Sequence, residues 1–384
     1  MRVLHSLDVY LGMSENWIYP QITRVPGTET RVICGAVANL DDFPIEDFRL
    51  RNQNAGWASK NESSRLVSAL LRRSGISNAI TAQWICRWSP EVIHSHFGPR
   101  GWSDLRLKRR SGARLVTSFY GYDAWSIPQT GPIWRQRYAE LFEHCDLILV
   151  EGPIMQRKLV ALGCPPEKVR IVRIGVDVAG LAFRERSFWG ELRVAMVGRY
   201  VEKKGLVDGM RACAIARKNG VNLRLTIVGD AQEEDVKGQA IKRALLDIAQ
   251  QPELSGYVHF AGFLPLRATR TLLSQQDVLL CPSKQGSDGN AEGGSPVVLT
   301  EAMAMGLLCI GTRHCDIPEV IHDNETGFLC YEGDVFGLAE SLNRLAENRA
   351  GVVDMTIAGR RHIEKSFNLA VQLDGISENY RSLC

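Results

Sequence analysis

Basic residues and glycine are combined in the segment VGRYVEKKG, which covers residues 197–205. The expected strand ends at Val197, Gly198 lets the backbone turn, and Arg199 and Lys204 flank a loop that leads into a helix. A diphosphate group requires fixed N–H donors at a helix start together with nearby positive charge. The segment therefore predicts a phosphate-binding loop, with a solvated basic turn as the alternative. Its glycine spacing matches neither GxGxxG nor a P-loop.

A second candidate loop, DGNAEGGSP at residues 288–296, is rich in glycine and leads into an apolar helix expected over Val297–Met305. Backbone N–H groups of Gly294 and Ser295 can bind an anion at the start of that helix. Glu301 lies inside the helix, where a carboxylate is costly unless it is paired or used, for example on ribose hydroxyls. Its alternative role is that of a buried salt-bridge partner.

The first half of the chain offers polar residues after two further expected strands. His94 and His96 in IHSHFG share one face of a strand because side chains alternate with a period of two. Two histidines can ligate zinc, but no third ligand stands at a helpful spacing, so we expect no metal site. His96 is the better placed of the two for a cleft, with a core histidine as the alternative. In YGYD, residues 120–123, Asp123 can bind substrate hydroxyls or cap a helix.

Short, continuous apolar runs alternate with helical patterns along the whole chain, which predicts an α/β protein with parallel sheets. A junction rich in proline and glycine near residues 165–190 separates two doubly wound halves. We expect domains at residues 1–178 and 179–365, and a terminal helix at residues 366–384 that returns to the first domain. Ligands bind beyond the carboxyl ends of parallel strands, so the candidate loops are in the right places. The strands are expected at residues 2–9, 30–38, 92–95, 114–118, 147–150, 192–197, 223–228, 258–260, 278–281 and 308–311, and one helix at residues 60–73.

The composition suits a cytoplasmic protein of two domains. The chain has 384 residues, and its ten cysteines form no CxxC pair, which favours reduced thiols. It contains neither a secretory leader pattern nor an apolar run of about 18 residues. The net charge of +3 is unevenly spread, because residues 51–110 contain 11 basic and 3 acidic residues, with several tryptophans in or near that stretch. This pattern suits an anionic membrane surface, with a phosphorylated substrate or an ordinary solvated surface as the alternatives. No nucleic-acid motif is present, so we expect no nucleic-acid partner.

These segments together resemble the retaining GT-B glycosyltransferases of family 4. VGRYVEKKG is similar to the family's VGRLxxxKG loop, and AEGGSPVVLTEAMAMG to its E…P…EAMA segment. SENWIYPQI resembles the SETFI..QI segment of exopolysaccharide-type members, VIHSHFG their HAHFG loop, and SFYGYDAW their FHGYD loop. The resemblance implies that Arg199 and Lys204 hold the donor's diphosphate. It further implies that Glu301 holds the ribose and that Glu292 lies beside the donor sugar.

Two departures from the family pattern bear on the site. Eight residues separate Glu292 from Glu301, where the family has seven, so we expect the loop to bulge and Glu292, rather than Gly293, to take the first glutamate position. Tyr120 stands where many members have histidine. We assign Tyr120 and Gly12 to the acceptor side.

The resulting hypothesis is a retaining glycosyltransferase of cell-surface polysaccharide biosynthesis. It would move a sugar from a nucleotide-diphosphate sugar to a glycan or lipid-linked glycan, with no metal and no cofactor beyond that co-substrate. The expected catalytic residues are Glu292, His96 and Asp123, and the expected location is the cytoplasm, with peripheral contact to the plasma membrane. A nucleotide-sugar epimerase of the same architecture and a non-catalytic nucleotide- or glycan-binding protein are the alternatives.

Overall fold

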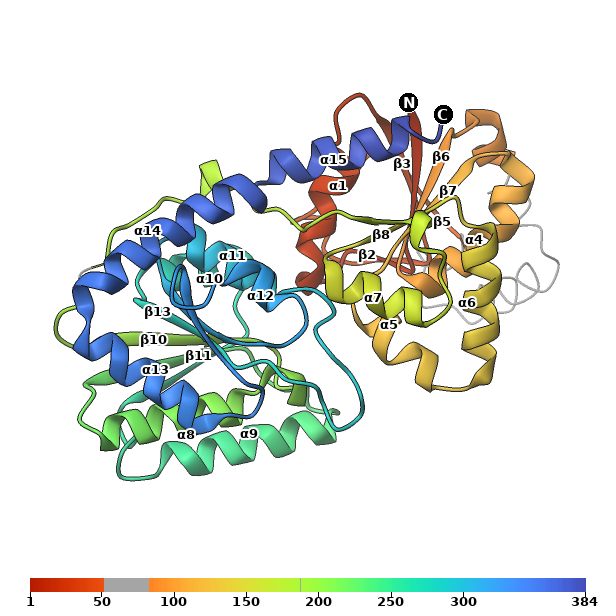
Figure 1. Cartoon of the computed structure of the whole chain (residues 1–384). Helices are drawn as coiled ribbons and strands as arrows, with labels where there is room; N and C mark the ends of the chain where they lie inside the picture. The colour runs from red at the N-terminus through yellow and green to blue at the C-terminus, as the bar shows by residue number, and fades with distance from the viewer. Residues whose placement is uncertain (52–82, 187) are drawn as a thin grey trace. The chain divides into compact units, whose positions relative to one another are not determined.

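The computed structural model describes residues 1–51, 83–186 and 188–384, so the helix expected at residues 60–73 lies outside the described residues (Figure 1). The chain divides into two compact units. Unit 1 comprises residues 1–150, 156–172 and 372–384, and unit 2 comprises residues 151–155 and 173–371. Each unit is built on one parallel sheet with helices, as expected for two doubly wound domains. The chain passes between the units at 150/151, 155/156, 172/173 and 371/372, whereas the sequence suggested boundaries at 178/179 and 365/366 alone.

The sheet of unit 1 has the strand order β5-β3-β1-β6-β7-β8-β9. Its strands pair in parallel, and the central strand β6 is buried along its whole length although it contains His94, Ser95 and His96. The order reverses between β1 and β6, so the loops after these two strands meet at a topological switch point. The strands are β1 (Arg2–Ser6), β3 (Glu29–Cys34), β5 (Phe48–Leu50), β6 (Val92–His96), β7 (Arg114–Ser118), β8 (Leu147–Val150) and β9 (Val169–Ile171), and a separate pair joins β2 (Val9–Tyr10) to β4 (Ala36–Val37).

The first helical segment of unit 1 begins directly after Gly12. It is a 3-10 helix that starts at Met13. The backbone N–H of Gly12 donates to the carboxylate of Glu15 (3.1 Å), which anchors this start. The helical segments are η1 (Met13–Ile18), α1 (Tyr19–Thr23), α4 (Gly98–Ser111), α5 (Tyr122–Trp125), η2 (Ile127–Gln129), α6 (Pro132–His144), α7 (Pro153–Ala161) and η3 (Pro166–Lys168).

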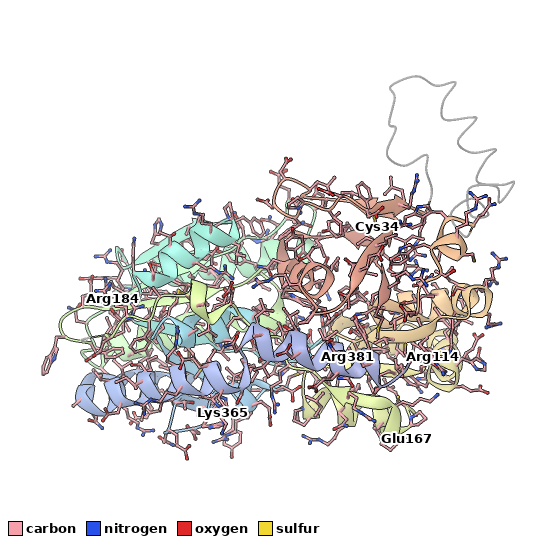
Figure 2. The ribbon with its side chains drawn as sticks, turned by 90° about the horizontal axis from the view of Figure 1, so that it is seen from above. Cys34, Arg114, Glu167, Arg184, Lys365 and Arg381 are labelled. Atoms are coloured by element: carbon pink, nitrogen blue, oxygen red, sulfur yellow. The ribbon has the colours of Figure 1, made fainter. Side chains whose placement is uncertain are left out.

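The last helix, α15 (Leu369–Arg381), packs on unit 1 with its C-terminal part. The hydroxyl of Tyr380 lies 2.6 Å from His94 Nδ1 in the middle of the sheet. At the end of the chain, the guanidinium of Arg114 donates to the carbonyl of Leu383 (3.1 Å). Figure 2 labels Arg114 and also Arg381, the last residue of α15. The terminal segment is therefore part of the core of unit 1.

The sheet of unit 2 has the order β12-β11-β10-β13-β14-β15 and is also parallel. Helices α8, α9 and α13 cover one face, and α10, α11, α12 and α14 cover the other (Figure 1). The switch point lies between β10 and β13, so the loops at residues 198–205 and 282–296 meet there. The elements are β10 (Leu192–Val197), β11 (Leu223–Val228), β12 (Val258–Gly262), β13 (Val278–Cys281), β14 (Leu308–Thr312), β15 (Gly327–Cys330), η4 (Val178–Gly180), η5 (Glu202–Lys204), α8 (Leu206–Lys218), α9 (Val236–Ala249), α10 (Leu266–Ser274), α11 (Val297–Ala304), α12 (Ile317–Val320), α13 (Val335–Glu347) and α14 (Arg349–Ser366).

Candidate active site

Lys204 and Glu292 form an ion pair at the switch point of unit 2. Lys204 Nζ lies 2.8 Å from Glu292 Oε1, and the hydroxyl of Ser283 donates to the same oxygen (2.9 Å). The Glu292 side chain is only 6% exposed. Burial on its own raises the pKa of this carboxyl, but the charges of Lys204 and Lys203 and the hydrogen bonds from Lys204 and Ser283 lower the pKa to about 2. Glu292 is therefore a partner of the predicted phosphate-binding lysine that is charged at neutral pH.

A second lysine, which the sequence analysis did not single out, completes this cluster. Lys203 is buried, donates to the carbonyl of Ala291 (2.9 Å) and lies 3.6 Å from Glu292 Oε2. Burial lowers the pKa of Lys203, and the charges of Lys204 and the exposed Arg199 add to this effect, while Glu292 opposes it. Two lysines thus flank one carboxylate, and Arg199 adds a third positive charge near Lys203, a combination that suits a diphosphate.

Glycines let the two loops of this cluster approach each other closely. Gly205 has φ 60°, and a side chain there would collide with the carbonyl of Pro282. Gly198 packs against the aliphatic part of Lys204, where a Cβ would lie 3.1 Å from Lys204 Cγ and Cδ. Backbone freedom and the absence of a side chain are thus both needed here. These contacts hold Lys204 beside the loop of Glu292.

Gly293 directly follows Glu292 in the glycine-rich loop. Gly293 adopts φ 92°, in the left-handed region that favours glycine, and the side chain of Glu292 reaches the lysines. The expected bulge, and the match of Glu292 to the family's first glutamate position, stay predictions. The carboxylate of Glu151 lies so close to Gly294 that no side chain would fit there. Ser295 follows, ahead of the N-cap Pro296 of α11.

Glu301 on α11 is paired in the structure. It is 3% exposed, and its Oε1 accepts hydrogen bonds from Nε (3.0 Å) and Nη2 of Arg270 on α10. Burial raises the pKa of Glu301, and the charge and hydrogen bonds of Arg270 oppose that rise. The salt-bridge alternative is therefore realised, through an arginine that the sequence analysis did not connect with Glu301. Its expected role on the ribose stays a prediction.

In unit 1, Asp123 ties together the loops that follow β6 and β7. Its Oδ2 accepts the backbone N–H of Gly98 (2.9 Å) and its Oδ1 that of Tyr120 (3.0 Å). Burial raises the pKa of Asp123 to about 6, although these backbone hydrogen bonds lower it. With both oxygens engaged and 1% of the residue exposed, the carboxylate positions the two loops.

His96 lies beneath Tyr120 at the end of β6. Its Nδ1 is 2.8 Å from the hydroxyl of Tyr120, and its Nε2 is 3.0 Å from Nδ1 of His5. Both histidines are completely buried, which lowers the pKa of each and favours neutral rings. His96 therefore fixes the hydroxyl of Tyr120, the residue that replaces the family's histidine.

The structure also supplies the third histidine that the spacing of His94 and His96 did not offer. His5 on β1 pairs in register with His94, and ring nitrogens of all three lie within 4.8 Å of one another. Both nitrogens of His94 already have hydrogen-bonding partners, namely Tyr380 (2.6 Å) and Ser118 (2.7 Å). This donor set fits a hydrogen-bonded histidine cluster better than a metal site, since a metal ion would have to break these bonds.

Two family models match the chain. The model for glycosyl transferases group 1 matches residues 182–362, and that for Glycosyltransferase Family 4 matches residues 47–179. The chain is 33% identical to the amylovoran biosynthesis glycosyltransferase AmsK of Erwinia amylovora over 294 residues, which are 76% of this chain and 70% of that protein. It is 31% identical to the putative colanic acid biosynthesis glycosyltransferase WcaL of Escherichia coli K12 over 341 residues, or 88% and 81% of the two chains. The chain belongs to the family 4 glycosyltransferases.

Solved structures show the fold of this glycosyltransferase. HepE of Anabaena in complex with UDP superposes with a TM-score of 0.80 at 16% identity, and each chain is covered completely. Sucrose-phosphate synthase of Thermosynechococcus elongatus gives a TM-score of 0.77 at 17% identity, covering 100% of this chain and 99% of that one. The predicted GT-B fold is confirmed.

Several residues around Glu292 were not predicted from the sequence of this glycosyltransferase. Lys203 had a visible signal, since it stands next to Lys204 in the loop that was singled out. Ser283 and His314 lie in loops after β13 and β14, and their contacts with Glu292 depend on strands that are adjacent only in the sheet. No spacing along the chain reveals such contacts.

Proposed function

We propose that this glycosyltransferase moves a sugar from a nucleoside diphosphate sugar to a glycan or lipid-linked glycan in the biosynthesis of an exopolysaccharide. The observation that carries the proposal is the pair of Lys203 and Lys204 around Glu292 at the switch point of unit 2, with the charge of Arg199 close to Lys203. Support comes from relatives named for amylovoran and colanic acid biosynthesis, and from HepE, whose structures contain UDP or UDP-glucose.

The energetic problem of the reaction is the departing nucleoside diphosphate, on which negative charge develops. Lys204 and Arg199 stabilise that charge, because preorganised cations need no reorganisation as the bond breaks. Backbone N–H groups of Gly294 and Ser295 contribute further donors, and Gly198 leaves space for the approach of the ligand. In this proposal the cations take the place of a divalent metal.

The remaining donor contacts follow from the two glutamates. Glu301 binds ribose hydroxyls while Arg270 keeps its carboxylate oriented. Glu292 accepts hydrogen bonds from hydroxyls of the donor sugar. The configuration at the anomeric carbon is retained, with the leaving phosphate helping to deprotonate the acceptor hydroxyl.

The acceptor side is formed in unit 1. Tyr120 and Gly12 lie in loops beyond strand ends, where ligands bind in parallel sheets. His96 acts by holding the hydroxyl of Tyr120, and Asp123 acts by holding the backbone of the two loops.

A ligand panel followed by turnover tests the function. We expect UDP, GDP, ADP or dTDP, and the corresponding nucleotide sugar, to raise the unfolding temperature of the full chain, because ligands that bind the native state stabilise it. With a glycan acceptor, the product should keep the donor's anomeric configuration by NMR, and EDTA should leave the rate unchanged. Conversion of the donor without acceptor would support an epimerase instead, and binding without turnover a non-catalytic protein.

We further propose that the C-terminal end of α4 contacts an anionic membrane on the cytoplasmic side. Arg106 and Arg110 are exposed there. Two aromatic side chains, Trp102 and Trp134, lie nearby with Arg137 against both rings (4.2 and 4.7 Å from the ring centroids). Basic residues attract anionic lipid, and tryptophans suit the lipid–water interface. None of the described helices is long and apolar enough to cross a bilayer, so the proposed contact is peripheral.

The vesicle-binding prediction separates the exposed cations from those already paired. Lys108 and Arg109 form ion pairs with Asp146 (2.7 Å) and Glu140 (3.1 Å), so they are left unchanged. The double variant Arg106→Gln/Arg110→Gln should bind vesicles of phosphatidylglycerol and phosphatidylcholine roughly 10- to 30-fold more weakly in a sedimentation assay.

The matched control removes two exposed lysines of unit 2, Lys218→Gln/Lys365→Gln, with the same change in net charge. Equal weakening in both double variants would show a general charge effect. Binding that persists in the Arg106/Arg110 variant would contradict the proposed surface.

A further inference from the structure

His314 lies in the loop after β14. It contacts the loop at residues 282–296, called the donor loop below, through the backbone of that loop and not through its side chains. Its Nε2 accepts the backbone N–H of Glu292 (3.1 Å), and its Nδ1 lies 2.7 Å from Glu332 Oε1. Glu332 Oε2 in turn accepts the backbone N–H of Gln285 (2.8 Å). The His314 side chain is only 3% exposed, whereas that of Glu332 is 38% exposed. A buried imidazole thus connects a surface carboxylate with the donor loop.

These contacts define one tautomer of His314. A backbone N–H can only donate, so Nε2 must offer its lone pair to Glu292. The ring proton therefore resides on Nδ1 and is donated to Glu332. The thiol of Cys315 lies 3.3 Å from the same Nε2, as a further donor to the lone pair. The ring has one defined orientation, because Nε2 must accept a hydrogen bond and Nδ1 must donate one.

The pair of His314 and Glu332 holds the donor loop at two points. Glu332 binds the backbone at Gln285, near the beginning of the loop, and His314 binds it at Glu292. Gly293 follows with φ 92°. A loop that contains several glycines has more conformational freedom to lose on ordering, so such anchors have a larger effect on its conformation.

Anchoring of the Glu292 backbone also fixes its carboxylate, and with it the lysines. Glu292 Oε1 lies 2.8 Å from Lys204 Nζ, so a displaced loop displaces the partner that orients this cation. Preorganised charge is what the proposed diphosphate site requires, because reorientation during the reaction costs free energy.

We propose that His314 and Glu332 are positioning residues that clamp the donor loop and thereby present Lys204 to the diphosphate of the donor. Neither residue touches the substrate. The inference rests on the proposed function of Lys204, and it adds that the affinity for the diphosphate depends on a histidine that binds only protein atoms.

The test uses the full chain and the tightest-binding member of UDP, GDP, ADP and dTDP, with the matching nucleoside as the reference ligand. His314→Phe removes both hydrogen bonds while retaining a ring, and it should weaken diphosphate binding about tenfold or more by calorimetry. Binding of the nucleoside should change little. His314→Gln should stay within about threefold of wild type, because an amide offers an acceptor for Glu292 and a donor for Glu332.

A double-mutant cycle distinguishes positioning from general damage. In a Lys204→Met background, His314→Phe should cause no further loss of diphosphate affinity, since the cation that it positions is absent. Glu332→Leu serves as a second variant should His314→Phe fail to fold, because Glu332 is partly exposed; the same loss, confined to the diphosphate, is expected.

Two outcomes would overturn the clamp: equal losses for diphosphate and nucleoside, or losses that add to those of Lys204→Met. Failure of the proposed function has a different signature, because wild-type protein would then bind none of the four nucleoside diphosphates. Wild-type binding with unchanged affinity in His314→Phe and Glu332→Leu would reject the clamp alone.

Discussion

Lys204→Met is expected to lower kcat/KM for the nucleotide sugar by about 10²- to 10³-fold, the usual cost of removing one preorganised group that stabilises transition-state charge. Methionine retains much of the aliphatic stem that packs against Gly198, so the change is confined mainly to the ammonium group. The measurement is the initial rate with donor and acceptor at several donor concentrations, together with the affinity for the nucleoside diphosphate. Lys218→Met, an exposed lysine at the end of α8, is the matched control and should retain the wild-type rate.

The same substitution also leaves Glu292 with a weaker partner, since Lys203 Nζ is 3.6 Å away. The rate could fall because the variant misfolds and not because the ammonium group is missing. The double variant Lys204→Met/Glu292→Gln distinguishes these causes, because it removes the uncompensated carboxylate as well. That variant should recover stability but not activity. Wild-type turnover in Lys204→Met would remove the assignment of Lys204 to the diphosphate.

Glu292→Gln is expected to destabilise the protein by about 3 kcal/mol at pH 7, because two cations beside a buried position lose their charged partner. Glutamine retains an acceptor for the hydroxyl of Ser283, so the change in the free energy of unfolding comes mainly from the lost negative charge. The measurement is urea denaturation of the full chain. Glu233→Gln, an exposed carboxylate in the loop after β11, is the control and should change the free energy of unfolding by less than about 0.5 kcal/mol.

The pH dependence of this difference provides an independent check. The folded-state pKa of Glu292 is about 2, below its ordinary value of 4.5, so the folded state favours the charged form. Its stabilisation is complete above the ordinary pKa and is lost as the pH falls toward 2. The stability difference between wild type and Glu292→Gln should therefore shrink from pH 5 to pH 3. A difference that is independent of pH in this range would contradict the buried ion pair.

Much of the fold could be read from local sequence. Parallel strands that are covered on both faces have continuous apolar sequences, and the segments Leu147–Val150 in β8 and Val278–Cys281 in β13 are of this kind. The candidate loops were also recognised, because glycine and charged residues directly after such strands stand out.

The two doubly wound halves, the loops beyond their strands and the family could all be predicted from the amino-acid sequence. The partners of the site residues became visible only in the folded chain: Lys204 with Glu292, Glu301 with Arg270, and His96 with His5. Strand identity depends on local periodicity, whereas a contact between side chains depends on the order and register of strands that are distant in the chain. His5 pairs with His94 across 89 positions through the alignment of β1 and β6, and no local pattern encodes that alignment.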